Sequence, residues 1–268
     1  MISFFDVHAH YTDKRYSEYG FDVDFILRDC FSTNVYKIVN SGTNPENSKE
    51  AIEMSKKYPR MCASVGIHPT DAFFIEDCDY ALEQIEQLVI HERDEIAAIG
   101  EIGLDYFHED MLNKSKQKYF FDNLLSMSEK YRLPVVIHCR EAMGDCLDIV
   151  RVHPYSYGVF HCYAGSAETA KELVKKNYFI SVCGNVTYKK SDKLENVIKT
   201  VGPEYLLTET DAPYMSPVPL RGTVNNSSNI LHSATKIAQI LDMNLDSFAK
   251  TTRNNADGIF KAPKFCKL

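Results

Sequence analysis

The sequence predicts an α/β fold in which residues 1–268 form a single-domain (β/α)8 TIM barrel. The length of 268 residues matches single-domain α/β barrels, which run near 250 residues. Apolar or β-branched runs alternate with amphipathic helical patterns through eight successive units. Residues of types that can bind metal ions stand at the ends of six of these runs, and only a closed ring brings six strand ends around one point. Alternation alone would also fit an open, doubly wound sheet.

The predicted strands are short apolar runs, and continuous runs such as residues 134–138 suit parallel strands covered on both faces. Strands separated by helices imply right-handed βαβ units. The strand predictions are Ser3–His8, Tyr36–Ser41, Cys62–Ile67, Glu95–Ile102, Pro134–His138, Gly158–His161, Tyr178–Val182 and Tyr205–Thr208. The helix predictions are Pro45–Lys57, Tyr80–His91, Lys114–Tyr131, Ala167–Lys176, Asp192–Thr200, Asn229–Leu241 and Leu245–Phe260.

Composition excludes several classes of protein. Apolar residues make up 44% of the chain, but no apolar run approaches the roughly 18 residues of a membrane span. Residues 1–10 do not resemble a signal peptide, and the eight cysteines contain no CxxC pair, which favours a reduced, cytoplasmic protein. A net charge of −7 argues against sequence-independent coating of duplex DNA. It leaves hydrolysis of phosphate esters open, because bound cations can supply positive charge.

Two histidines at the end of the first predicted strand are candidates for metal binding. His8 and His10 lie two residues apart, so both imidazoles point to the same face of the strand. Two imidazoles on one face can hold one cation. The alternative is a pair of ordinary polar residues at a barrel mouth.

Four further candidates lie at the ends of other predicted strands. Glu101 stands in a glycine-flanked segment, where a carboxylate can bridge two cations. His138 and His161 each follow an apolar run, and Asp211 follows residues 206–208. Each alone could be a structural histidine or a turn acid. Four histidines and two acids at strand ends, in a chain with nine histidines, together favour a metal site.

The donor types indicate a pair of divalent cations. Nitrogen and oxygen donors without thiolate suit zinc, manganese or a similar ion, and magnesium and cobalt also remain open. Six donors exceed what one open zinc site takes. They predict two cations about 3.5–4 Å apart, the arrangement used for phosphoryl displacement.

Several segments resemble the TatD family of metal-dependent deoxyribonucleases, in the order in which that family has them. These segments are DVHAH (6–10), GIHP (66–69), GEIGLDY (100–106), LPVVIHCREA (133–142), HCYAG (161–165) and ETDAPY (209–214). The resemblance implies a barrel of the metallo-dependent hydrolase type that hydrolyses DNA phosphodiesters, often from an end. It implies these ligands: His8, His10 and Asp211 on one cation, His138 and His161 on the other, and Glu101 bridging them.

The resemblance weakens after residue 214. Family members commonly show Arg-Gly followed by Asn-x-Pro, whereas here Arg221-Gly222 precedes Asn225-Asn226-Ser227 and the proline is absent. Gly258 stands where an arginine is frequent. The first departure lies beside the expected site, so it bears on substrate preference and leaves the ligands unchanged.

Catalytic and substrate-binding roles follow from the same pattern. Asp211 is the predicted base, and Glu101 is also predicted to be catalytic, through the cations that it bridges in the family. His68 could bind a phosphate or act as general acid, and a structural cap is its alternative. Arg140 could bind a phosphate or form a surface ion pair, and Tyr106 could stack on a base. Weaker candidates for contact with a base or a phosphate are Tyr163, Lys189 and Lys190.

We therefore expect a hydrolase that cleaves DNA by two-metal activation of water, acting on single-stranded or frayed ends and not on membranes. A metallohydrolase of small amides, lactones or other esters is the first alternative. Many such enzymes bridge their cations with a carboxylated lysine, and no lysine closes an apolar strand in the first four units. A non-enzymatic module that binds metal or nucleic acid is the second.

Overall fold

The computed structural model describes residues 2–107 and 113–267, whose strands form one sheet in the order β1 to β8. Helices separate successive strands, and β8 is followed by a return to β1, where Ala9 pairs with Ala212. This is the strand order of a (β/α)8 barrel, so the predicted fold class is confirmed. The strands are β1 Phe4–Ala9, β2 Val35–Ser41, β3 Met61–Val65, β4 Ile96–Asp105, β5 Val135–Arg140, β6 Gly158–Phe160, β7 Tyr178–Val182 and β8 Leu206–Thr208.

The α-helices include two that the sequence patterns predict with the observed limits, Pro45–Lys57 and Lys114–Tyr131. None of the helices in the described ranges is long and apolar enough to cross a membrane. The helices are α1 Arg15–Glu18, α2 Val23–Ser32, α3 Pro45–Lys57, α4 Cys78–His91, α5 Lys114–Tyr131, α6 Met143–Val152, α7 Ala167–Lys175, α8 Asp192–Val201, α9 Ile230–Ile240 and α10 Leu245–Ile259. Short 3-10 helices are η1 Asp71–Phe74, η3 Gly184–Thr187, η4 Pro203–Tyr205, η5 Ser227–Asn229 and η6 Pro263–Lys267.

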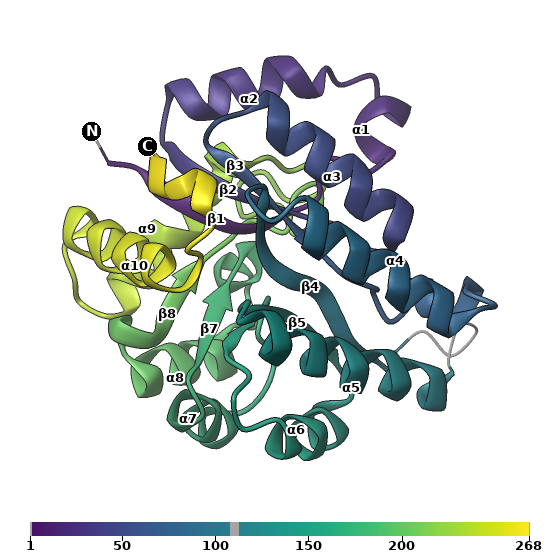
Figure 1. Ribbon diagram of the computed structural model, residues 1–268. Coiled ribbons are helices and arrows are strands. Elements are labelled where there is room, and N and C mark those ends of the chain that lie inside the picture. Colours follow the sequence, from purple (N-terminus) through teal and green to yellow (C-terminus); the bar gives the residue numbers. More distant parts are fainter. Residues whose placement is uncertain (1, 108–112, 268) are drawn as a thin grey trace. The chain divides into compact units, whose positions relative to one another are not determined.

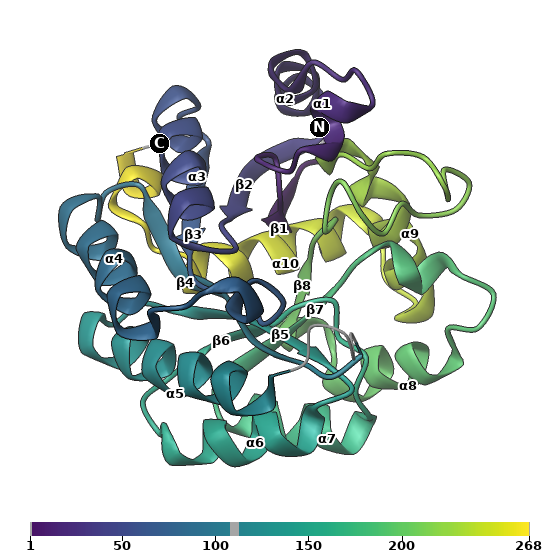
Figure 2. The same cartoon turned by 90° about the vertical axis from the view of Figure 1, so that its right-hand side faces the viewer.

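The chain divides into two compact units. In unit 1, β1 pairs with β2 and β7 pairs with β8, and α7 lies beside α8 (Figure 2). In unit 2, β3 to β6 pair in succession, and α5 packs against β4 (Figure 1). Unit 1 comprises Met1–Asn40 and Cys162–Ile259, and unit 2 comprises Ser41–His161 and Phe260–Leu268.

Helix starts follow residues whose side chains accept a hydrogen bond from the first turn. Before α3, the Asn44 side chain accepts from the Asn47 amide at 2.9 Å, and Pro45 occupies the first turn, where its missing N–H costs nothing. Removing such a cap costs about 1 kcal/mol. Comparable caps precede α2, α4, α5 and α7 at Asp22, Asp77, Asn113 and Ser166.

Strand β4 continues past its predicted end at Ile102 to Asp105. Gly103 makes this possible, because its φ is +137° and a Cβ there would lie 2.0 Å from the carbonyl oxygen of His138. With no side chain at Gly103, β4 stays paired with β5 in the register Gly103 to His138. Glu101 therefore lies inside the strand, which corrects its predicted place at the strand end.

Candidate metal centre

A first cluster in unit 1 consists of His8, His10 and Asp211. The Nε2 atoms of His8 and His10 each lie 3.6 Å from Oδ1 of Asp211, and the two rings meet edge to face with centroids 4.6 Å apart. Both histidines are buried and Asp211 is 15% exposed at its side chain. The cluster is thus largely removed from water but can be reached from it.

The spacing in the first cluster suits one cation. Donor atoms about 2.1 Å from a tetrahedral ion lie about 3.4 Å from one another, close to the 3.6 Å observed here. Two imidazole nitrogens and one carboxylate oxygen are donors that zinc and manganese accept. The residues of the first cluster therefore fit a divalent cation.

A buried network on Asp6 holds β1 to the segment that carries Asp211. The Asp6 carboxylate accepts hydrogen bonds from Thr210 N at 3.0 Å, Thr210 Oγ1 at 2.6 Å and Ser227 Oγ at 2.6 Å. Burial raises the pKa of Asp6 to about 7, although these hydrogen bonds oppose the rise. The Asp211 amide in turn donates to the carbonyl oxygen of His8 at 3.0 Å.

The same network explains the serine that replaces the family's proline. Ser227 is fully buried, its hydroxyl donates to Asp6, and its backbone amide donates to the Tyr11 hydroxyl at 2.9 Å. Asn225 donates to the carbonyl oxygens of Thr210 and Tyr214 at 2.9 and 2.7 Å. In this chain the departure from the family pattern therefore supports the backbone around the first cluster.

A second cluster in unit 2 consists of His68, Glu101, His138 and His161. Oε1 of Glu101 lies 2.9 Å from Nδ1 of His138 and 2.8 Å from Nε2 of His161. The same oxygen lies 3.4 Å from Nε2 of His68, and the His138 and His161 nitrogens are 3.2 Å apart. One oxygen of Glu101 and one ring nitrogen each of His138 and His161 therefore converge, and these three donors fit a divalent cation, with His68 beside them.

Asp105 lies behind this cluster and was missed by the sequence reasoning. Its Oδ2 lies 3.0 Å from Nε2 of His138, on the opposite side of the ring from Glu101. Burial alone would lower the pKa of His138, but the hydrogen bonds to Asp105 and Glu101 raise it to about 9. The two carboxylates thus favour positive charge at this ring, and a cation would compete there with a proton. The sequence did contain a signal for this residue, because Asp105 follows Glu101 by four positions in the same segment.

His68 faces Glu101 with a defined ring nitrogen. The Thr70 amide donates to Nδ1 of His68 at 3.1 Å, which places the proton of the neutral ring on Nε2, toward Glu101. Burial lowers the pKa of His68, so the ring is neutral near pH 7. The sequence predicted His68 at the same site but did not predict its contact with Glu101.

The predicted substrate contacts lie on unit 2 after β4 and β5. Arg140 is exposed at the end of β5, with its guanidinium carbon 3.6 Å from the centre of the Phe107 ring. Tyr106 donates to Asp145 at 2.6 Å, and the Lys114 ammonium lies 4.2 Å from the centre of its ring. The roles of Arg140 and Tyr106 stay predictions.

Glu209 is a second buried acid that the sequence reasoning did not single out. Its carboxylate accepts a hydrogen bond from the amide of Cys162, a residue with φ of +41°. This contact holds the chain in the turn directly after His161. Sγ of Cys162 lies 2.9 Å from Sγ of Cys183, so the buried thiol of Cys183 packs against the partly buried thiol of Cys162 beside Glu209.

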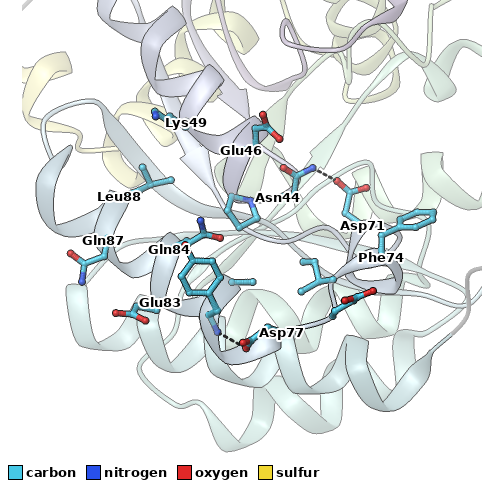
Figure 3. Close-up of a pocket in the computed structure, with 15 residues that line it drawn as sticks. Asn44, Glu46, Lys49, Asp71, Phe74, Asp77, Glu83, Gln84, Gln87 and Leu88 are labelled. Atoms are coloured by element: carbon cyan, nitrogen blue, oxygen red, sulfur yellow. Dashed lines mark hydrogen bonds between the residues drawn. The ribbon is translucent and has the colours of Figure 1, made fainter.

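A cavity of about 1020 Å³ lies along α3 and α4 in unit 2 (Figure 3). The Asn44 side chain donates to Asp71 at 2.7 Å at its edge, and Lys49 is the single basic residue among those that line it. This lining would repel a polyanion, and it contains none of the predicted site residues. Its acidic residues are Glu46, Asp71, Glu76, Asp77 and Glu83.

Comparison with known proteins adds independent findings. The model of the family described as TatD related DNase matches residues 5–261. An uncharacterized metal-dependent hydrolase of Bacillus subtilis (strain 168), YabD, is 35% identical over 259 residues, covering 96% of this chain and 98% of the relative. A similarly named protein of Methanocaldococcus jannaschii is 31% identical over 260 residues, covering 97% and 98%. The crystal structure of YjjV, a TatD homolog from Escherichia coli K12, matches with a TM-score of 0.88 and 28% identity, covering 97% and 98%.

Proposed function

This chain belongs to the TatD related DNase family of metal-dependent hydrolases, and we propose that it is a deoxyribonuclease that hydrolyses phosphodiester bonds from the ends of DNA strands. The observation that carries the proposal is the donor set of the two clusters. Each cluster joins imidazole nitrogens to a carboxylate oxygen at spacings that suit one divalent cation. The two clusters would therefore take two cations in all, with zinc, manganese, magnesium and cobalt as candidates.

The fold class supports one shared reaction. In (β/α)8 enzymes, the residues at and beyond the carboxyl ends of the strands form the catalytic face. The residues of the first cluster lie at the end of β1 and after β8. Those of the second lie after β3, on β4 and β5, and directly after β6. On this ground we propose that both clusters serve the same hydrolysis.

Each residue of the site would have a separate role in the reaction. Divalent cations held here would lower the pKa of water and offset the negative charge of the phosphate. Asp211 would orient the attacking water and accept its proton, since it is the member of the first cluster that is partly exposed. Neutral His68 would donate a hydrogen bond from Nε2 to a phosphate oxygen or to the leaving oxygen. Arg140, exposed at the end of β5, would bind a flanking phosphate.

Hydrolysis of small amides, lactones or other esters is the competing function. Enzymes of that kind often bridge their cations with a carboxylated lysine, whereas the bridging position predicted here is Glu101. A carboxylate supplied directly by the chain favours the phosphodiesterase reaction.

A direct test begins with the metal content of the purified protein. The metal-free protein would then be reloaded separately with zinc, manganese, magnesium or cobalt, and given end-labelled single-stranded DNA. We expect stepwise shortening of a linear strand and no cleavage of a circular strand of the same sequence. A variant with His8→Ala and His10→Ala is the control for contaminating nucleases. Turnover of amides or lactones with intact DNA, under every metal, would contradict the proposal.

A further inference from the structure

A second cavity, in unit 1, has a volume of about 480 Å³ and a basic lining. We call it the basic pocket. It lies between the segment after β6, the segment after β7 and the start of α8. Its lining residues are Tyr163, Ala164, Gly165, Asn185, Tyr188, Lys189, Lys190, Ser191, Lys193, Leu194 and Arg221.

Four of these residues are cationic and none is acidic. Lys189, Lys190, Lys193 and Arg221 are all exposed. Lys193 is held against the pocket wall, because its ammonium donates to the carbonyl oxygen of Ala164 at 2.8 Å. The pocket is therefore a local concentration of positive charge in a chain whose net charge is −7. The acidic cavity along α3 and α4 has the opposite character (Figure 3).

The start of α8 brings groups of both kinds to the pocket. Its first residues line the pocket, and its N-cap residue Ser191 makes no capping hydrogen bond from its side chain to the first turn. The N-terminal amides and the helix dipole favour an anion at this end, whereas Asp192 and Glu195 in the first turn oppose one. The positive charge of the pocket therefore comes from its lysines and Arg221.

Two tyrosines line the pocket, and hydrogen bonds fix the positions of their hydroxyl groups. The guanidinium carbon of Arg221 lies 4.4 Å from the centre of the Tyr188 ring, and the Tyr188 hydroxyl donates to the carbonyl oxygen of Ser216 at 2.9 Å. Tyr163 is buried and donates to the carbonyl oxygen of Ser166. Tyr188 is the better candidate for contact with a base, which revises the expectation that Tyr163 would stack on one.

The pocket is attached to the segment that carries the predicted base. Asp211 and Arg221 lie ten residues apart on the segment after β8, and the Ser216 contact ties Tyr188 to that segment. Close packing reinforces this link, because a Cβ on Gly184 would lie 1.8 Å from the carbonyl oxygen of Met215.

We propose that the basic pocket binds the phosphates of a single DNA strand next to the nucleotide that is hydrolysed. The pocket would hold the strand through charge and through contact with Tyr188, without reading its sequence. This inference rests on the proposed function, since it takes the polynucleotide as the substrate of the first and second clusters. It adds that recognition extends beyond the scissile phosphate, so that longer strands bind better than minimal esters.

The test compares two substrates of different length. One is a single-stranded DNA oligonucleotide of twelve residues, and the other is bis(p-nitrophenyl) phosphate, whose single phosphate leaves no neighbouring phosphate for the pocket to bind. The variant is Lys189→Gln with Lys190→Gln. Its matched control is Lys175→Gln with Lys199→Gln, which removes the same charge from the last turns of α7 and α8.

For the pocket variant we expect the KM for the oligonucleotide to rise about tenfold, with kcat unchanged. The slope of log KM against log salt should fall by about 0.7 for each phosphate that the variant no longer neutralises. Hydrolysis of the short ester should stay within twofold of the unmodified enzyme, as should all values for the control. An unchanged KM and slope for the oligonucleotide, or an equal decrease in activity on both substrates, would overturn the inference.

Equilibrium binding separates this inference from the proposed function. The fluorescence anisotropy of a labelled oligonucleotide can be followed in EDTA, where no hydrolysis occurs. We expect salt-dependent binding that is about tenfold weaker in the pocket variant and unchanged in the control. If the loaded enzyme cleaves no DNA, the proposed function fails, and equal binding by pocket variant and control then rejects the pocket as well.

Discussion

Replacing Asp211 by asparagine tests the predicted base with little change in shape. Asp211 has a φ of +55°, in the left-handed region, which Asn tolerates better than most residues. The amide keeps an oxygen near the His8 and His10 nitrogens but cannot accept a proton from water. General bases typically contribute 10²- to 10⁴-fold, so we expect kcat to fall about 10³-fold, or about 4 kcal/mol in the barrier.

Stability should separate this effect from unfolding. We expect the free energy of unfolding of Asp211→Asn to stay within about 0.5 kcal/mol of the unmodified protein. Asp211→Ala should be less stable by a further 1–2 kcal/mol or so, because alanine is strained in the left-handed region. Urea unfolding measures both values without reference to activity.

The assay is single-turnover cleavage of an end-labelled strand, with the metal content of each variant measured on the same sample. A rate near that of the unmodified enzyme would refute the assignment of Asp211 as the base. If the rate recovers once the metal is restored to full occupancy, Asp211 acts as a metal ligand and not as the base.

Three further results are expected. Asp105→Asn should weaken metal binding 10- to 100-fold, because the variant lacks the carboxylate that orients His138. A competition titration with a metal-binding dye measures this affinity, and an unchanged affinity would contradict that role for Asp105. Ser227→Ala should lower the free energy of unfolding, measured in urea, by about 1–3 kcal/mol, because the buried carboxylate of Asp6 loses a hydrogen-bond donor. The exposed Ser126→Ala is its control, and an equal cost in both would count against the network. Removing the metal should lower the Tm. Adding the cation back at 100 times its Kd should raise the free energy of unfolding by about 2.7 kcal/mol. A Tm that does not depend on metal would contradict binding of the cation to the folded state.

The fold was largely predictable because each strand and helix has its own spacing of apolar residues, which can be recognised within a short stretch of sequence. The limits of α3 and α5 follow from caps and apolar spacing that lie within a few residues of each other. Helix α6, Met143–Val152, was not predicted, and it begins after Ala142 without a side-chain cap. Its limits depend on packing that a local pattern does not contain.

The candidate site was predictable as a set of donors but not as a set of contacts. His8 and His10 are recognisable because residues two apart at the end of one strand point to the same face. Asp105 and Glu209 are not, since each acts on a residue more than thirty positions away. The end of β4 depends on how closely Gly103 approaches β5, a distance that appears only once the strands are paired.

The division of the chain has a consequence for the order in which the clusters can mature during translation. The four residues of the second cluster lie between positions 68 and 161 and leave the ribosome before any residue beyond them. The first cluster joins the beginning of the chain to Asp211, made fifty residues after His161. At about 5–20 residues per second this gap lasts roughly 3 to 10 s. A nascent chain therefore contains all four residues of the second cluster before Asp211, the carboxylate of the first cluster, has been made.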